Sequence, residues 1–161
     1  SQPFIVARMT EHLLSHTSKR GKVLNHVLEI GSGCGYQSAV LSYFANDVCA
    51  VERIKPLVAK SRENLSELKI RNVIVKHADG FNGWEEDLKF DGIICAAAPR
   101  QYPEELLDLL EVGGKLVIPV GLEGKQKLYV VTKKSETENE EIINEEVAFV
   151  PMLPGVSNGE F

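Results

Sequence analysis

Apolar and polar positions recur along the chain with two different periods, which predict helices and strands in alternation. The opening segment, residues 3–20, has apolar side chains at helical spacing, and Ser1 and Pro3 serve as start signals. The apolar run 27–30 then stops at a row of glycines, which is typical of a buried parallel strand that leads into a turn. Further helices are predicted at 37–45, 56–69 and 103–110, and further strands at 46–52, 72–80, 90–99, 115–121, 127–134 and 145–153.

The order of these segments predicts the fold class. Strand and helix alternate through the first two thirds of the chain, which favours a parallel sheet with crossover helices. The last two strands are joined only by the polar stretch 135–144, which is too short for a crossover helix, so they are expected to be antiparallel. We therefore expect an α/β fold with a doubly wound, mostly parallel seven-stranded sheet, helices on both faces and a C-terminal antiparallel hairpin. The acidic run Glu136–Glu146 is interpreted as a solvated hairpin loop rather than an interaction surface.

The composition is that of an ordinary globular protein. Of the 161 residues, 43% are hydrophobic and 25% are charged, so residues 1–161 are expected to form a single domain. Eighteen basic residues against twenty-three acidic ones leave a net charge of −5, which argues against nucleic acid or an anionic membrane as a partner. No run approaches the roughly 20 apolar residues that cross a bilayer, and the first residues lack the pattern of a secretory signal. We therefore expect a cytoplasmic monomer.

Cysteines and histidines are common metal ligands, but their spacing here does not favour a metal site. Cys34, Cys49 and Cys95 are odd in number and lack the spacing of a zinc site, so we interpret them as reduced thiols. His12 and His16 share one face of the first predicted helix, yet no H-E-x-x-H motif accompanies them. We therefore expect a solvated helix face at these histidines and no metal cofactor.

The turn after the first predicted strand carries the strongest chemical signal. Ligands of doubly wound sheets bind beyond the carboxyl ends of the strands, and this turn reads EIGSGCG, with glycines at 31, 33 and 35. Glycines at alternate positions allow a sharp turn and a close approach of the backbone to a ligand, although such a turn can also serve only to pack a strand against a helix. Glu52, at the end of the next predicted strand, adds a carboxylate that can accept hydrogen bonds from both ribose hydroxyls of a nucleoside.

Two kinds of nucleoside ligand compete for this site. The dinucleotide motif G-x-G-x-x-G requires glycine at position 36, where this chain has Tyr36, so a dinucleotide is less favoured. A nucleoside without a pyrophosphate needs close approach of the backbone more than a phosphate cradle. Asp79, followed by Gly80 after the third predicted strand, can hydrogen-bond an adenine amino group. S-adenosylmethionine meets these demands.

A family resemblance rests on these and further motifs. VLEIGSGCGY, VERI, HADG and FDGIICAAAP stand in the order and spacing of class I S-adenosylmethionine-dependent methyltransferases. More narrowly, the chain resembles the protein-L-isoaspartate O-methyltransferase family over nearly its whole length, through SQPFIVARMTEHLL, HADGFNGW, AAAPRQYPEELLDLLEVGGKLVIPVG and VPMLPG.

The resemblance implies roles for particular residues. The residues that wrap the methionine and ribose parts of the cofactor are Gly31, Ser32, Gly33, Cys34 and Gly35. Glu52 is implied to hold the ribose hydroxyls, and Asp79 with Gly80 to meet the adenine. Ser1 corresponds to the serine with a catalytic or substrate-orienting role.

Two features depart from the family pattern. The family usually begins with further residues ahead of this serine, which help to close over the cofactor, so we expect an N-terminal lead segment to be lacking here. Ala78 stands where the family often has glycine.

The implied reaction transfers a methyl group from S-adenosylmethionine to the free carboxylate of L-isoaspartyl residues in damaged proteins, so isoaspartyl peptides and proteins are the expected partners. A carboxylic acid with a pKa of about 4 is already ionised at neutral pH, so no general base is required. The small apolar residues from Ala96 to Pro99 suit a wall beside the methyl group better than a site for an amine acceptor. Cys95 lies within an apolar strand and is interpreted as packing rather than as a nucleophile.

Two other functions remain open at this point. One is a cofactor-binding module that lacks catalysis because the lead segment is absent. The other is a class I methyltransferase for a small molecule or nucleic acid, because a fold does not determine its substrate. The second alternative leaves the SQP opening and the AAAP segment without a role.

Overall fold

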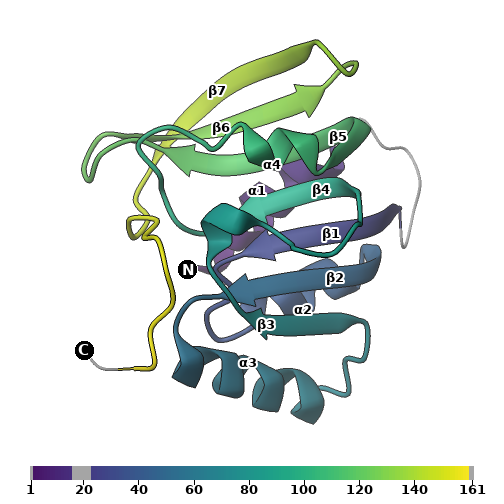
Figure 1. Ribbon diagram of the computed structural model, residues 1–161, viewed down its shortest axis with the longest axis vertical. Coiled ribbons are helices and arrows are strands. Elements are labelled where there is room, and N and C mark those ends of the chain that lie inside the picture. Colours follow the sequence, from purple (N-terminus) through teal and green to yellow (C-terminus); the bar gives the residue numbers. More distant parts are fainter. Residues whose placement is uncertain (1, 16–22, 160–161) are drawn as a thin grey trace.

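One seven-stranded sheet forms the centre of the protein, whose computed structural model describes residues 2–15 and 23–159 (Figure 1). The strand order is β3-β2-β1-β4-β5-β6-β7. The strands are β1 (Leu24–Ile30), β2 (Ala45–Glu52), β3 (Val73–His77), β4 (Phe90–Cys95), β5 (Leu110–Val120), β6 (Gln126–Lys133) and β7 (Asn139–Val147). The helices are α1 (Pro3–Leu14), α2 (Tyr36–Ser42), α3 (Lys55–Glu67) and α4 (Glu105–Asp108), with a short 3-10 turn, η1 (Gly80–Asn82).

The pairing of the strands confirms the predicted fold class. Strands β1 to β5 pair in parallel, while β6 and β7 are antiparallel to their neighbours at one edge. Val27 of β1 lies opposite Val48 of β2 on one side and Gly92 of β4 on the other. From β1 the chain first builds outward through β2 and β3 and then returns to add β4 on the opposite side. This reversal of strand order at β1 creates a crevice at its carboxyl end, where doubly wound sheets bind ligands.

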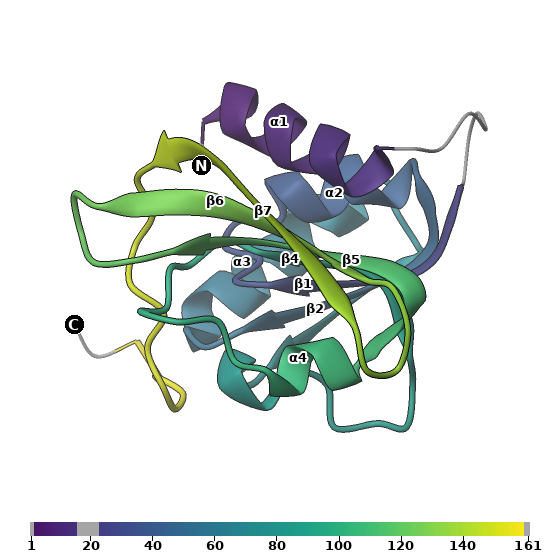
Figure 2. The same cartoon turned by 90° about the horizontal axis from the view of Figure 1, so that it is seen from above.

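Helices cover both faces of the sheet, with α1 and α2 on one face and α4 on the other (Figure 2). Met9 and Leu13 of α1 pack with Val27 of β1 in one apolar cluster. Leu106 of α4 packs with Leu28 of β1 in a second cluster on the opposite face. Adjacent residues of β1 therefore enter different cores, which explains why Val27, Leu28 and Ile30 are all apolar.

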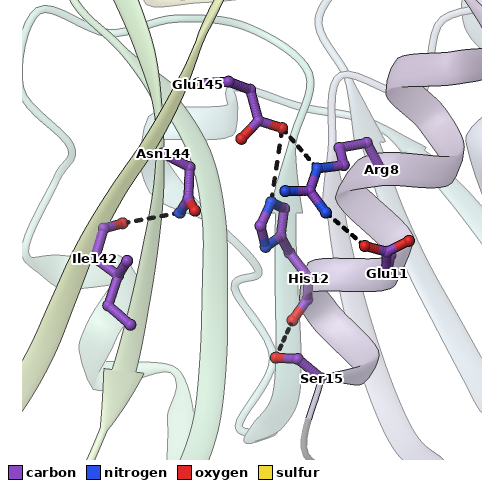
Figure 3. A network of polar contacts seen from close by, with 7 residues as sticks. All are labelled: Arg8, Glu11, His12, Ser15, Ile142, Asn144 and Glu145. Carbon is purple, nitrogen blue, oxygen red and sulfur yellow. Dashed lines mark hydrogen bonds and ion pairs between the residues drawn. The ribbon is translucent and has the colours of Figure 1, made fainter.

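Helix α1 is held against β7 by polar side chains (Figure 3). Arg8 Nε donates a hydrogen bond to Glu145 Oε1 over 2.8 Å, and His12 Nε2 lies 3.7 Å from the same oxygen. The His12 side chain is only 14% exposed. The prediction of a solvated helix face is therefore wrong at His12, because β7 covers that side of the helix. His16 lies outside the described residues.

Helices α1 and α4 depart most from their predicted bounds. Helix α1 ends at Leu14, and most of its predicted continuation to residue 20 falls outside the described residues. The predicted helix at 103–110 is a single turn, α4, and β5 already begins at Leu110. The glycine pair at 113 and 114 lies inside β5 at a shift of register against β4. A Cβ on Gly114 would lie 2.9 Å from the carbonyl oxygen of Glu111, so this irregular stretch requires glycine.

The C-terminal strand is also displaced from its predicted position. Strand β7 occupies most of the polar stretch that was interpreted as a loop, and it pairs antiparallel with β6 as predicted. It is an edge strand, and Ile142 and Ile143 are each 50% exposed. Residues 139–143 of this strand are all exposed, and such a segment carries no clear alternation of apolar and polar residues, which is why the pattern was missed. The segment 148–153, which was expected to be strand, instead leads across the ends of the parallel strands.

Candidate functional site

A cavity of about 530 Å³ opens at the carboxyl ends of β1, β2 and β4. Its floor is formed by residues 31–34 of the glycine loop, and Glu52 closes one side, while Gly35 does not line the cavity. Ala96 and Ala97 form a small apolar wall after β4, and residues 148–153 form part of the rim. The cavity therefore lies at the switch point of the sheet and brings together the glycine loop and the acidic residue singled out from the sequence.

The glycine loop adopts a backbone that side chains disfavour. Gly31, Gly33 and Gly35 have φ angles of +84°, +53° and +91°, which lie in or near the left-handed region where glycine is favoured. The loop is anchored because Gly31 N–H donates to the Val51 carbonyl oxygen of β2 over 2.8 Å. A Cβ on Gly35 would lie 3.2 Å from the Cβ of Ser61 on α3. The alternating glycines are thus explained by backbone conformation throughout and by close helix packing at Gly35.

Glu52 fixes the loop from the neighbouring strand. Its Oε2 accepts a hydrogen bond from Gly33 N–H over 2.9 Å, and its Oε1 accepts one from Ile54 N–H over 3.0 Å. The side chain is buried and lines the cavity. Each carboxylate oxygen has a second lone pair, so Glu52 can also accept hydrogen bonds from hydroxyl groups of a ligand.

Asp79 and Gly80 lie on the same side of the cavity, but only Gly80 lines it. Gly80 and Ala78 line the wall, and a Cβ on Gly80 would lie 2.5 Å from Ile30 Cγ2. The Asp79 carboxylate accepts hydrogen bonds from two backbone N–H groups, those of Phe81 over 2.9 Å and of Gly155 over 2.7 Å. Asp79 therefore caps η1 and holds the C-terminal segment while it stands directly beside the cavity wall.

Two residues of the glycine loop, Ser32 and Cys34, bring polar side chains to this region. Ser32 Oγ is buried without a hydrogen-bond partner, and Ser32 lines the cavity. A buried hydroxyl without a partner is costly unless a ligand or water satisfies it. Cys34 of the same loop is exposed and also lines the cavity.

A buried carboxyl that the sequence reasoning missed lies behind the glycine loop. Glu29, at the end of β1, is fully buried, and both of its oxygens accept hydrogen bonds from Ser38 Oγ on α2, over 2.8 and 3.0 Å. Burial raises the pKa of Glu29 to about 7; the bond from Ser38 opposes this rise, and the charge of Glu52 adds to it. The signal in the sequence was an acidic residue at the end of an otherwise apolar strand, directly before the glycines.

The structure also shows the surroundings of the cysteines and other residues to which the sequence analysis assigned no catalytic or metal-binding role. Cys95 is fully buried, and burial raises the pKa of its thiol to about 12, so the prediction of a packing role is confirmed. The three cysteines are free, as expected. Over the described ranges, no group of three or more His, Cys, Asp or Glu residues could hold a metal ion. No helix in this part of the chain is long and apolar enough to cross a membrane. Ser1 lies outside the described residues.

Comparisons with known proteins agree on one family. The family model described as protein-L-isoaspartate(D-aspartate) O-methyltransferase matches residues 1–157. A protein-L-isoaspartate O-methyltransferase of Methylobacillus flagellatus is 51% identical over 160 residues, which cover 98% of this chain and 69% of that protein. Protein-L-isoaspartate O-methyltransferase 1 of Marinobacter nauticus is 49% identical over 156 residues, which cover 97% of this chain and 68% of that protein.

Solved structures agree on the fold. A Plasmodium falciparum protein described as a protein-L-isoaspartate O-methyltransferase, in complex with S-adenosyl-L-homocysteine, is 30% identical with a TM-score of 0.72. The match covers 95% of this chain and 75% of that one. An rRNA methylase of Streptococcus thermophilus, 23% identical with a TM-score of 0.55 over 74% of this chain and 72% of that one, shares the fold alone.

Proposed function

The chain belongs to the protein-L-isoaspartate(D-aspartate) O-methyltransferase family, and from this premise we propose that it methylates the free carboxyl group of L-isoaspartyl residues in proteins, with S-adenosylmethionine as the methyl donor. The observation that carries the proposal is the family match over residues 1–157. The resemblance inferred from the sequence motifs is thereby confirmed at the level of the family.

The residues at the cavity fit this cofactor. Gly31 and Gly33 of the loop line the cavity without a side chain, so their backbone is open to a ligand. A Cβ on Gly80 would collide with Ile30 at the wall. We propose that the loop holds the methionine and ribose parts, that Glu52 accepts hydrogen bonds from the ribose hydroxyls, and that Gly80, together with Asp79 beside the wall, meets the adenine.

The reaction requires orientation rather than acid or base chemistry. The cofactor supplies an electrophilic methyl group on a sulfonium; as a substrate carboxylate oxygen bonds to the methyl carbon, the carbon–sulfur bond breaks and its electrons remain on sulfur. The acceptor is ionised before it binds, so this chain does not have to remove a proton. Alignment of two reactants can contribute about 7 to 11 kcal/mol in favourable cases. We assign this alignment to the cavity, whose apolar wall at Ala96 and Ala97 excludes water beside the methyl group.

Ser1 completes the proposal on the substrate side. By resemblance to the family, its hydroxyl orients the substrate carboxylate without neutralising it. The variant Ser1→Ala is expected to lower kcat for an isoaspartyl peptide while the dissociation constant for S-adenosylhomocysteine stays the same. Equal kcat values for the two proteins would remove Ser1 from the site.

We also propose that residues 1–161 form one domain that acts as a monomer in the cytoplasm, without a nucleic acid or membrane partner. The net charge of −5 supports the absence of an anionic partner. The three free cysteines are consistent with a reducing compartment.

The proposed activity is tested with labelled S-adenosylmethionine and two peptides that differ only in an isoaspartyl or an aspartyl linkage. Base-labile methyl groups are expected on the isoaspartyl peptide alone. Titration with S-adenosylhomocysteine in parallel separates two failures: binding without methylation would indicate a cofactor-binding module, and absence of binding would contradict the assignment of the cavity.

A further inference from the structure

The C-terminal segment crosses the cofactor cavity as a strap, which we define as residues 151–157. Pro151 forms a bridge with Ala98 after β4, and Ser157 forms a bridge with Ile54 after β2. Strand β1 lies between β2 and β4 in the sheet. The strap therefore passes over the end of β1, where the glycine loop begins, and runs along the side of the sheet on which the parallel strands end (Figure 1).

The first part of the strap is a wall of the cavity. Pro151, Met152 and Leu153 line it, and Met152 is buried. The Met152 Cε atom lies 3.3 Å from the position that a Cβ on Gly80 would take. A shift of the strap would therefore change the space that is open to the cofactor beside Gly80.

The far end of the strap is held by a histidine that does not itself line the cavity. His77 Nε2 lies 2.9 Å from the Arg53 carbonyl oxygen and 3.1 Å from the Ser157 carbonyl oxygen. Both partners only accept hydrogen bonds, so the proton of His77 must be on Nε2, from where it is shared between them. His77 ends β3 and thus joins three segments: its own strand, the turn after Glu52 and the strap.

Backbone hydrogen bonds join the strap to the turn at the same two carbonyl groups that His77 contacts. Ser157 N–H donates to the Arg53 carbonyl oxygen over 2.7 Å, and Lys55 N–H donates to the Ser157 carbonyl oxygen over 2.9 Å. The same two carbonyl groups that receive the His77 proton therefore also form the bridge between strap and turn. Glu52, whose carboxylate holds Gly33, is the residue directly before this turn.

We propose that His77 is a positioning residue of the methyltransferase: it fixes the strap against the turn that follows Glu52 and so keeps the cavity closed around the cofactor. The inference rests on the proposed function, because it takes the cavity to be the S-adenosylmethionine site. His77 acts through the strap and touches neither cofactor nor substrate. Its loss therefore weakens binding of the cofactor and of its product while the chemical step is preserved.

The test compares His77→Ala with His77→Gln and with a matched histidine variant, His26→Ala. His26 lies near the amino end of β1, at the opposite edge of the parallel strands, with Nδ1 3.3 Å from Asp47 Oδ2. Titration calorimetry with S-adenosylhomocysteine is expected to show about tenfold weaker binding for His77→Ala, the effect of losing one hydrogen bond. His77→Gln retains an N–H donor and is expected to recover most of the affinity, and His26→Ala to bind as the parent protein does.

Two further readouts separate positioning from loss of structure. Hydrogen exchange at the Gly155 and Ser157 amides is expected to quicken in His77→Ala, while amides of the central strands stay protected. With an isoaspartyl peptide, KM for S-adenosylmethionine is expected to rise about tenfold, in line with the change in affinity, and kcat to stay within about twofold.

Four results would overturn the inference: unchanged affinity in His77→Ala, equal weakening in His26→Ala, failure of His77→Gln to restore binding, or a fall in kcat with KM unchanged. Parent protein that binds S-adenosylhomocysteine but methylates no isoaspartyl peptide would contradict the proposed function instead, and the affinities of the variants would still decide the role of His77.

Discussion

The buried carboxyl of Glu29 makes the stability of the protein depend on pH in a way that a single substitution can reveal. Glu29 is fully buried, and its only hydrogen-bond donor among the described side chains is the Ser38 hydroxyl. Burial raises the pKa of Glu29 from 4.5 to about 7. A carboxyl whose pKa is higher in the folded protein binds its proton more tightly there, so its stabilising contribution is complete below the unfolded pKa and is lost as the pH rises through about 7.

The size of the effect follows from the shift. A difference of about 2.5 pKa units corresponds to about 3 kcal/mol in the free energy of unfolding, at 1.36 kcal/mol per unit. Glu29→Gln has nearly the same shape, keeps an oxygen to accept the Ser38 proton and cannot ionise. Relative to this variant, the parent protein is expected to lose up to about 3 kcal/mol between pH 4.5 and pH 8.5.

Urea unfolding of both proteins at several pH values measures this difference directly, and the titration of all other groups cancels in the comparison. The matched control is Glu67→Gln, which makes the same chemical change at an exposed position near the end of α3, leaves Glu29 in place and is therefore expected to retain the loss of stability that Glu29 causes. Parallel curves for the parent protein and Glu29→Gln would refute the reasoning, since they would mean that Glu29 titrates alike in the folded and unfolded chains.

Three further predictions concern the cavity and its loop. Gly80→Ala places a Cβ 2.5 Å from Ile30 Cγ2 and is expected to cost about 1 to 3 kcal/mol in urea unfolding; unchanged stability would contradict the close contact. Glu52→Gln cannot accept from both Gly33 and Ile54, so calorimetry is expected to show about tenfold to hundredfold weaker binding of S-adenosylhomocysteine. In native protein at pH 8 iodoacetamide is expected to label Cys34 alone, more slowly with S-adenosylhomocysteine present, since burial raises the pKa of the Cys49 and Cys95 thiols to about 11 and 12; fast labelling of either would contradict their burial.

The elements that were predicted from the sequence are those in which a run of buried apolar residues ends at a glycine or begins at a proline. The strand that ends at Ile30 is buried on both faces and is followed by glycines, so its end and the turn were both predicted. Pro56 lies in the first turn of α3, as expected. The glycine loop and Glu52 line one cavity because they belong to neighbouring parallel strands, whose carboxyl ends meet at one edge of the sheet.

The parts that were missed depend on contacts between distant segments. Nothing local distinguishes the exposed edge strand β7 from a polar loop, because its stability comes from pairing with β6. The burial of Glu29 and the contacts of His77 with the strap depend on chain segments that are far apart in the sequence. The two hydrogen bonds that the Asp79 carboxylate accepts from backbone groups could likewise not be derived from the motif in which it stands.

The most direct test of the central claim is a competition in one reaction vessel between an isoaspartyl peptide and its aspartyl twin, with S-adenosylmethionine as the methyl donor and tandem mass spectrometry to locate the methyl group. The account predicts a methyl ester on the free carboxyl of the isoaspartyl residue, an unmodified aspartyl peptide, and loss of the product in Glu52→Gln at limiting cofactor. Methyl esters on both peptides, or an isoaspartyl peptide that stays unmodified while S-adenosylhomocysteine binds the protein, would contradict it.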